Sequence, residues 1–568
     1  MIIFQILLIV KYIHGYNKKL SGNLPITEYT IPSTAYYPCI TRNGIKIFGC
    51  TSDYGGNSGI VNFLLPRSEY TWEDEFHTNV INNNENVVYF INADMINEKT
   101  FNFIFLKPDK IAGIVFYDDT GKYNHWNDTL FRKYMYDYSK IPIIYLKDVT
   151  TLKFIKEECY EKYNANDNMV RKCKANLRTS MTSQAPVMKC LNRSDDNFSS
   201  AIFQSPVRCN LLGGKSVHYM TESDEPISYL FQIPIDGFSM FDGFAPSITT
   251  TVVPLALFLN FMNSLNMKDL KKEIIFSLFG GETMNSIGST RMNLDLKDKT
   301  FPRMFKVSKT AKYYNFKYYN ILYDFNATLQ ENCLNYFDQM EQYKTDSKAK
   351  NTGLLACHQK EFVENEFLFT SIFDTIKNFE RNCKVNKTDV NEAIDSHTKK
   401  IIQFIFGYEK VKLFDSKRKF DPNEFINCVA VNSNCTLFNA VISDHEKIQL
   451  SGPMDLYVGI NENENMFTFM VKRLVDYITG ENVPNVNITE CHNMTTKNYT
   501  YIWMNGYKKE GLCIKSSAFY SKAMLENATD DKVYRYINSK HLMAESSWNT
   551  DSIQFTLYIV QSKNYQVN

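Results

Sequence analysis

The fold of this 568-residue chain is decided by the stretch Glu273-Ile-Ile-Phe-Ser-Leu-Phe-Gly-Gly-Glu282-Thr-Met-Asn-Ser-Ile-Gly-Ser-Thr-Arg-Met292. Its apolar run, residues 274–279, lies between a charge and a glycine pair and predicts a strand buried on both faces. A polar residue just past the carboxyl end of a parallel strand lies where open α/β sheets bind their ligands. Glu282 is therefore the first candidate for a functional side chain.

Length and composition limit the classes of protein to consider. A chain of 568 residues exceeds a single hydrophobic core, so we expect two or more lobes. The 63 Lys and Arg residues against 62 Asp and Glu residues leave a net charge of +1, which gives no sign of a nucleic-acid partner. The basic cluster Lys417-Arg418-Lys419 is interpreted as a solvated loop.

The first residues indicate entry into the secretory pathway. Residues 1–10 are apolar but too short to span a bilayer, and they predict the core of a signal peptide covering residues 1–16. No later apolar run reaches the length of a transmembrane helix, because residues 252–262 are interrupted by Pro254 and Asn260. Glycosylation acceptors of the Asn-x-Ser/Thr type also favour a lumenal or extracellular protein, at Asn127, Asn192, Asn197, Asn326, Asn386, Asn434, Asn487, Asn493, Asn498 and Asn527.

The thirteen cysteines fit an oxidising compartment. Close spacing suggests four local bridges, although the connectivity is not fixed by sequence: Cys39/Cys50, Cys159/Cys173, Cys190/Cys209 and Cys491/Cys513. The pairing of five others stays open: Cys333, Cys357, Cys383, Cys428 and Cys435. No Cys-x-x-Cys pair supports a structural zinc site.

Strand and helix patterns divide the chain into two α/β lobes. The smaller lobe, residues 17–205, contains expected strands at 87–91, 111–116 and 141–146 and a helix at 149–160. The larger lobe, residues 206–568, starts with one βαβ unit, in which a strand at 227–235 and a helix at 249–265 precede the 274–279 strand. Further expected helices and core segments lie at 361–383, 390–406, 455–458, 467–471 and 555–560.

This βαβ unit resembles the zinc aminopeptidase fold, whose two metals need several converging ligands. Pro234 stands where that fold has its first His, and Asp236 stands at the paired Asp. The Ala245-Pro-Ser-Ile-Thr249 turn lacks the next Asp, and Thr283 replaces the second carboxylate after Glu282. Two oxygen ligands are too few for a dinuclear site, so we expect no metal, no cofactor and no catalytic residue.

Other hydrolase chemistries have less support. Gly56-Asn-Ser-Gly59 is not a Gly-x-Ser-x-Gly elbow and is interpreted as a turn. The nine histidines form no His-Glu-x-x-His motif, and the adjacent Cys357 and His358 do not by themselves indicate a catalytic pair.

The segment from Gly281 to Met292, followed by Phe301-Pro302, resembles the Gly-Glu-Thr-Phe-Asp-Tyr-Ile-Gly-Ser segment of the nicastrin family. Nicastrins are the glycosylated, metal-free aminopeptidase-like subunits of γ-secretase. Further similar segments follow in the family's order: Cys39 with Phe48-Gly-Cys50, Ile111-Ala-Gly-Ile114, His125-Trp126-Asn127, Phe241, Ala245-Pro246, Asn487-Ile-Thr-Glu-Cys491, Tyr501-Ile-Trp503, Cys513 and Glu545-Ser-Ser-Trp548. Residues 310–430 carry little of the resemblance.

The resemblance implies a bilobal α/β ectodomain, with a mixed phosphorylase/hydrolase-type sheet flanked by helices in the larger lobe. It implies a non-catalytic role in γ-secretase, with presenilin and the other subunits as partners and Notch-type and amyloid-precursor-type membrane stubs as substrates. The family has Asp-Tyr where this chain has Asn285-Ser286, and its transmembrane helix would follow residue 568. We expect that this sequence is an incomplete product or an ectodomain, with a soluble divergent member as the alternative.

The resemblance also assigns candidate site residues. Glu282 and Asn285 are candidates for binding a substrate's α-amino group, and the alternative is that Glu282 caps the following segment through N–H groups near Asn285 and Ile287. Trp126 and Phe241 are candidates for a lid and a pivot between lobes, or else ordinary core aromatics. Two other functions remain open: a secreted aminopeptidase and a soluble peptide-binding glycoprotein.

Overall fold

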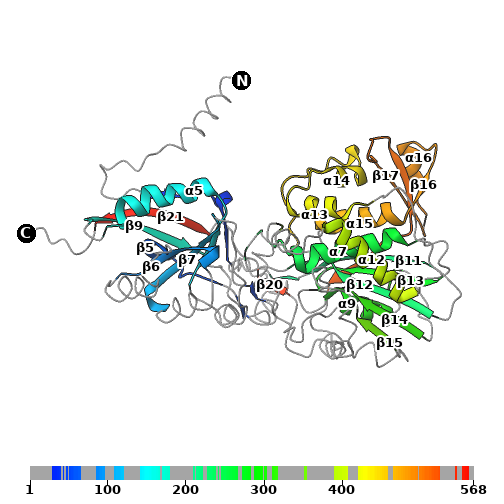
Figure 1. Cartoon of the computed structure of the whole chain (residues 1–568), viewed down its shortest axis with the longest axis horizontal. Helices are drawn as coiled ribbons and strands as arrows, with labels where there is room; N and C mark the ends of the chain where they lie inside the picture. Colours follow the sequence, from blue (N-terminus) through cyan, green and yellow to red (C-terminus); the bar gives the residue numbers. More distant parts are fainter. Residues whose placement is uncertain are drawn as a thin grey trace, which may run out of the picture.

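The computed structural model contains two α/β lobes that lie side by side (Figure 1). Most of the residues that the structure describes lie in these long segments: 28–64, 85–95, 108–119, 141–179, 209–302, 389–406, 420–457 and 465–524. Shorter pieces are residues 310–316, 351–354, 376, 544–546 and 553–561. The structure does not describe the remaining residues, nor short gaps inside these segments at 40–41, 44–46, 49, 167–168, 212, 222–226, 238–240, 242, 244, 266–271, 283–286, 298–299 and 497.

The smaller lobe is built on an eight-stranded mixed sheet in the order β1-β21-β9-β5-β6-β7-β8-β2. Its four central strands are parallel, and every described residue of β6 and β7 is buried, as their unbroken apolar sequences predict. In sheet order the strands are β1 (Glu28–Thr30), β21 (Gln554–Gln561), β9 (Arg171–Arg178), β5 (Asn57–Leu64), β6 (Val87–Asn92), β7 (Ile111–Tyr117), β8 (Ile143–Leu146) and β2 (Tyr36–Pro38).

One helical segment crosses the smaller lobe's sheet (Figure 1). It begins as α5 (Val149–Phe154), capped by Asp148, and continues as the π-helix η5 (Ile155–Asn164). The Asn164 amide ends it by donating to the carbonyls of Val61 and Cys173 at 2.8 Å each and accepting the Cys173 N–H at 2.9 Å. The expected helix is therefore present, but it extends beyond the expected bounds.

The last described strand corrects the expected lobe boundary. The expected large lobe ran from 206 to 568, but β21 pairs antiparallel with β1 and with β9. Phe555 and Leu557 on β21 are fully buried in the smaller lobe's core. The larger lobe is thus an insertion between β9 and β21. The apolar pattern of residues 555–560 predicts a strand but does not show which strand it pairs with, so the sequence does not reveal this insertion.

The larger lobe has a six-stranded mixed sheet in the order β15-β14-β12-β13-β11-β19. Four strands are parallel, β11 pairs antiparallel with β13, and β19 pairs antiparallel with β11. Their bounds are β15 (Asn351–Leu354), β14 (Thr310–Asn315), β12 (Ile227–Pro234), β13 (Glu273–Phe279), β11 (Gly213–Met220) and β19 (Phe519–Met524). The expected βαβ unit is β12, the η7–α7 helix and β13.

Helices cover this sheet on both faces. The π-helix η7 (Ile248–Val252) leads into α7 (Val253–Ser264), which is apolar on all sides and therefore buried under other helices. Figure 1 shows α7, α13 (Pro422–Ala430) and α15 (Met466–Thr479) above the sheet, and α9 (Ile287–Lys297) below it. The mixed α/β architecture expected from sequence is confirmed.

α12 (Val390–Phe406) matches its expected range and packs on α7. Asn260, the buried amide of α7, donates to Asp395 at 3.1 Å and to Thr398 at 3.0 Å, so its amide N–H group is satisfied. The expected core segment 467–471 is part of α15, Leu456 of the expected 455–458 segment is buried, and residue 376 is the only described residue of the expected 361–383 helix.

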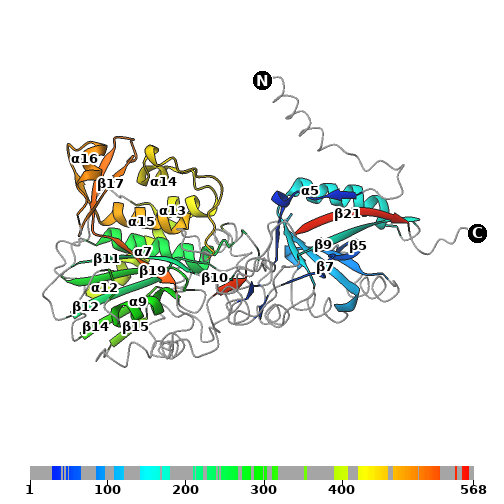
Figure 2. The same ribbon diagram turned by 180° about the vertical axis from the view of Figure 1, so that it is seen from behind.

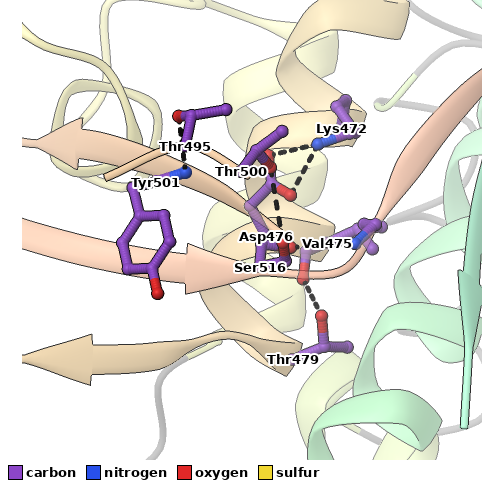
Figure 3. Close-up of polar contacts among 9 residues, drawn as sticks. Lys472, Val475, Asp476, Thr479, Thr495, Thr500, Tyr501 and Ser516 are labelled. Atoms are coloured by element: carbon purple, nitrogen blue, oxygen red, sulfur yellow. Dashed lines mark hydrogen bonds and ion pairs between the residues drawn. The ribbon is translucent and has the colours of Figure 1, made fainter. Parts of the chain in front are cut away.

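A three-stranded sheet, β16-β18-β17, packs beside α15. Figure 3 shows the contacts here: the Thr500 hydroxyl donates to the Ser516 carbonyl at 3.4 Å, and Lys472 bridges both Asp476 oxygens at 2.6 and 2.7 Å. Asp476 is fully buried, so this pairing offsets a large desolvation cost. The remaining elements are β16 (Glu481–Val483), α16 (Ile488–Asn493), β17 (Thr500–Met504), β18 (Leu512–Ser516), α14 (Thr436–Val441), β3 (Arg42–Asn43), β4 (Ile47–Phe48), η2 (Ser33–Ala35), η3 (Ala93–Met95), η4 (Pro108–Lys110) and η11 (Asp444–Glu446).

Four disulfides are present among the described residues. Three of them join expected pairs: Cys39–Cys50, Cys159–Cys173 and Cys491–Cys513. The fourth joins Cys428 to Cys435, whose pairing the sequence left open. Cys190, Cys333, Cys357 and Cys383 lie outside the described residues, so the expected Cys190/Cys209 bridge stays a prediction.

Two strand contacts lie where the lobes meet. Cys39 of the smaller lobe forms an isolated antiparallel bridge with Phe241 of the larger lobe. β10 (Cys209–Leu211) pairs with β20 (Ala544–Ser546), and Figures 1 and 2 show this pair between the lobes. In the part of the chain that the structure describes, none of the helices has the length and apolar character needed to span a bilayer.

Candidate functional site

Two carboxylates meet at the carboxyl edge of the larger lobe's sheet. β12 and β13 run parallel with Pro234 opposite Phe279, so Asp236 and Glu282 follow neighbouring strands at the same edge. Gly281, with φ of +74°, turns the chain so that Glu282 follows directly. This is where a parallel α/β sheet forms its ligand crevice.

Asp236 holds the strand ends together. Its side chain is 5% exposed, and Oδ1 accepts the backbone N–H of Glu282 at 2.8 Å. Its carbonyl oxygen accepts the Thr251 hydroxyl of η7 at 3.1 Å. The carboxylate therefore binds the chain's own backbone, which offsets part of the cost of burying it.

Glu282 is bonded to the helix that follows it. The residue is 8% exposed, and Oε1 accepts the N–H of Ser289, in the first turn of α9, at 2.7 Å. A carboxylate is stabilised at a helix N-terminus by the unpaired N–H groups and the helix dipole. The structure thus shows a cap of the kind weighed from sequence, made through the N–H of Ser289. Asn285 itself lies outside the described residues.

Close packing explains the glycines around Glu282. A Cβ on Gly288 would overlap the Gly280 carbonyl oxygen, so α9 sits directly against the end of β13. A Cβ on Gly281 would lie 3.0 Å from the Cβ of Ile287. The sequence Gly-Gly-Glu followed by Ile-Gly-Ser therefore fits a helix held against a strand end with no intervening side chains.

Ser247 lies in the Ala245–Thr249 turn, which the sequence comparison with zinc aminopeptidases singled out for its missing Asp. It is buried in the left-handed conformation, with φ of 43° and ψ of 43°, at the start of η7. Its carbonyl accepts the Val252 N–H at 3.0 Å, which makes the π-turn, and its Oγ packs against Gly237. Left-handed backbone and π-turns concentrate at functional sites, and here both adjoin Asp236.

The described residues do not form a metal centre. In the segments that the structure describes, no three His, Cys, Asp or Glu side chains converge in a way that could hold an ion. Asp236 and Glu282 already accept backbone N–H groups, and Ser247 offers only a neutral hydroxyl. The donor set is suited to binding the protein's own backbone.

His218 is a buried polar residue that the sequence did not single out. Its Nδ1 lies 3.0 Å from the Ser277 hydroxyl and its Nε2 lies 2.7 Å from the Ser521 hydroxyl, within the sheet. Burial lowers its pKa from 6.5 to about 3, so the imidazole is neutral. The alternating Ser216-Val-His218 polarity of β11 is the signal that could have placed it on this face.

Of the two residues expected to form a pivot and a lid between the lobes, only Phe241 is among the described residues. Phe241 is 2% exposed and forms the backbone bridge to Cys39, so it lies where the two lobes touch. Trp126 lies outside the described residues, and its packing on Phe241 stays a prediction.

Four of the expected glycosylation acceptors are described, and all four are exposed: Asn434, Asn487, Asn493 and Asn498. The other six lie outside the described residues: Asn127, Asn192, Asn197, Asn326, Asn386 and Asn527.

Comparisons with known proteins agree on one relationship. Rat nicastrin is 20% identical over 660 aligned positions, which cover 96% of this chain and 90% of the relative, and human nicastrin is 22% identical over 50% of this chain and 45% of its own. A crystal structure of nicastrin superposes with a TM-score of 0.60 at 17% identity, covering 94% of this chain and all of the other. No family model matches the chain.

The fold and the edge site together define a class: two-lobed mixed α/β proteins whose sheet-edge carboxylates bind their own backbone. Within that class, the similarity extends over nearly the whole chain in both sequence and structure. The chain is a nicastrin-like protein.

Proposed function

We propose that this chain is a non-catalytic, nicastrin-like subunit of a γ-secretase-type intramembrane protease. The matched crystal structure is described as a γ-secretase component, and the similarity to it covers 94% of this chain. The single observation that carries the proposal is this near-complete correspondence. Presenilin and the other γ-secretase subunits are the proposed partners, and the lumenal or extracellular face of a membrane is the proposed location.

The edge site supports the non-catalytic part of the proposal. An aminopeptidase needs metals and an activated water. Here the two remaining carboxylates accept N–H groups from Glu282 and Ser289, at 2.8 and 2.7 Å. Among the described residues, these two carboxylates stabilise the loops at this edge, which fits a pseudo-peptidase.

We propose that the subunit stabilises the complex and controls which membrane-protein stubs reach the protease. Glu282 with Asn285 is one candidate for recognition, since a substrate's ammonium group would share or replace the Ser289 N–H on the carboxylate. Steric exclusion by the two lobes is the other candidate, with Trp126 and Phe241 acting as lid and pivot. The Glu282–Ser289 bond makes direct recognition costly, because α9 would lose its cap.

Variants of Glu282 test these routes. We expect that Glu282→Gln, whose amide oxygen keeps the Ser289 bond, preserves co-purification with presenilin and lowers cleavage of an amyloid-precursor-type stub if ammonium recognition operates. Glu282→Ala removes both functions of the side chain and costs about 1 kcal/mol of α9 stability. Glu273→Ala, at the opposite end of β13, is the matched control.

Normal cleavage by both Glu282 variants would refute amine recognition, while failure of the wild-type chain to co-purify with presenilin would refute the subunit proposal. Glycosylated protein recovered alone would favour a soluble peptide-binding glycoprotein. Stoichiometric zinc together with hydrolysis of a fluorogenic aminoacyl substrate would instead establish the secreted aminopeptidase.

A further inference from the structure

The acceptor triplet Asn434-Cys435-Thr436 differs from the other described acceptors in its middle residue. Cys435, the N-cap residue of α14, is joined to Cys428, which lies seven residues earlier in the last part of α13. The middle residues at two other acceptors are the exposed side chains Met494 and Tyr499, which are 38% and 42% exposed. Among the described acceptors, Asn434 is the only one whose recognition triplet contains a disulfide-bonded cysteine.

The finished fold fixes every polar group of Cys435. Its N–H donates to the Ser433 carbonyl at 2.9 Å, and its carbonyl accepts the Asn439 N–H at 3.0 Å. Its Sγ accepts the Phe438 N–H at 3.4 Å as the N-cap of α14. The enzyme that attaches an N-linked sugar must draw the acceptor triplet into its own active site. The loop around Asn434 cannot be extended for this purpose without breaking the disulfide or the first turn of α14.

The same fold nevertheless has room for the sugar. Asn434 is exposed, and its side-chain oxygen accepts the Asn439 amide at 2.9 Å. That bond leaves its Nδ2, the atom that carries an N-linked sugar, uninvolved. A glycan attached beforehand is therefore compatible with the folded loop, so the conflict concerns the order of the two reactions and not the final product.

We propose that Asn434 is a glycosylation site whose occupancy is controlled by closure of the Cys428–Cys435 disulfide, with sugar transfer possible only before the bridge closes. Cys428 enters the lumen before Asn434, so both thiols are present once Thr436 completes the triplet. Bringing together thiols seven residues apart costs little chain entropy, which makes closure an effective competitor.

The two competing steps are balanced as follows. In transfer, Asn434 Nδ2 bonds to the anomeric carbon of a lipid-diphosphate-linked sugar, the lipid diphosphate leaves with the bonding electrons, and the nitrogen loses a proton. In closure, the two thiols lose two protons and two electrons to a disulfide of a lumenal oxidoreductase, which is reduced to a dithiol. After closure Asn434 is fixed in the loop and remains unmodified.

The inference rests on the proposed lumenal location, and one experiment separates the two. The full chain is expressed in mammalian cells, and site occupancy is measured by peptide mass spectrometry at Asn434, Asn487, Asn493 and Asn498. We expect wild-type Asn434 to be modified incompletely, and Cys428→Ser to raise its occupancy by roughly twofold or more, because bridge formation then no longer competes.

Controls isolate the local bridge. Cys435→Ser, which keeps an Asn-Ser-Thr acceptor, should raise occupancy equally, whereas Cys491→Ser, which removes a different bridge, should leave Asn434 unchanged. Occupancy at Asn434 that is insensitive to Cys428→Ser, with the other three sites modified, would overturn the inference alone. Absence of modification at all four sites would overturn the lumenal location and the inference with it.

Discussion

At the scale of single residues, His218 gives the larger lobe a defined response to acid. Its folded pKa is about 3 and its ordinary value is 6.5, so between these values the unfolded chain binds the extra proton. Stability must therefore fall as pH falls through this window, by up to about 1.4 kcal/mol per pH unit from this residue. We expect His218→Gln to be less stable than wild type at pH 7 but to lose less stability between pH 7 and pH 5 in urea unfolding.

His492, an exposed residue of α16, supplies the matched control, since His492→Gln should keep the wild-type pH dependence. An unchanged pH dependence in His218→Gln would mean that other groups dominate the acid response. The Ser277 and Ser521 hydroxyls explain why Gln is the informative replacement, since its amide can both donate and accept.

The positions of the candidate-site residues were predictable from the sequence, but their hydrogen-bond partners were not. The apolar run and glycine pair were enough to put Glu282 just past a strand end. The bond to Ser289 was not predictable, because it depends on how α9 folds back over residues 280–282. His218 was missed because the alternating polarity of β11 assigns it to one face of the sheet but does not show that this face is covered.

At the scale of secondary-structure elements, the position of α9 depends on Gly288. Alanine would improve helix propensity by about 1 kcal/mol. However, its Cβ would overlap the Gly280 carbonyl and lie 2.9 Å from the Ser216 hydroxyl, so we expect Gly288→Ala to cost about 1 to 3 kcal/mol. Thermal unfolding of the purified chain measures the net sign, and a stabilised Gly288→Ala would show that α9 is not held this tightly.

Gly214→Ala in β11 is the matched control for this prediction. A Cβ there would meet no atom within 4 Å, so its effect should be within about 0.5 kcal/mol of zero. The contrast between the two glycines separates close packing from the general effect of adding a methyl group.

Elements with strong periodic or apolar patterns were the predictable ones. Five such elements lie near their expected ranges, because the apolar residues that they bury follow one another closely along the sequence: β6, β7, β13, α7 and α12. The π-helical segments η5 and η7 were not predictable from apolar spacing: η5 ends at tertiary contacts of the Asn164 side chain, and η7 begins with the bond from the Val252 N–H to the Ser247 carbonyl. The same reason explains why the Cys428–Cys435 bridge was left open: sequence spacing alone does not show that α13 and α14 meet.

At the scale of the whole molecule, the smaller lobe requires residues from both ends of the described chain. β21 buries Phe555 and Leu557, and burial of each side chain contributes about 1.5–3 kcal/mol, against a typical domain stability of about 5–15 kcal/mol. We expect a chain ending at residue 551 to lose a folded smaller lobe, whereas a chain ending at residue 562 retains it. Limited proteolysis of the secreted products distinguishes the two.

The larger lobe provides the internal reference for this truncation. Its Cys491–Cys513 bridge lies far from β21 in sequence and should form in both products, as peptide mapping under non-reducing conditions would show. An equally protease-resistant smaller lobe in the shorter chain would contradict the role assigned to β21.

The placement of β21 also has a consequence for biosynthesis. Because β9 and β21 are neighbours in the sheet yet flank the entire larger lobe in sequence, a growing chain exposes the unfinished smaller-lobe sheet while several hundred residues are still being added. Chaperones would have to hold that sheet for the whole of this interval. The sheet of the smaller lobe is complete only after residue 561 has been synthesised. An interrupted chain therefore leaves this sheet unfinished, so quality control that recognises unfolded structure in the amino-terminal half would also detect a missing carboxyl-terminal end.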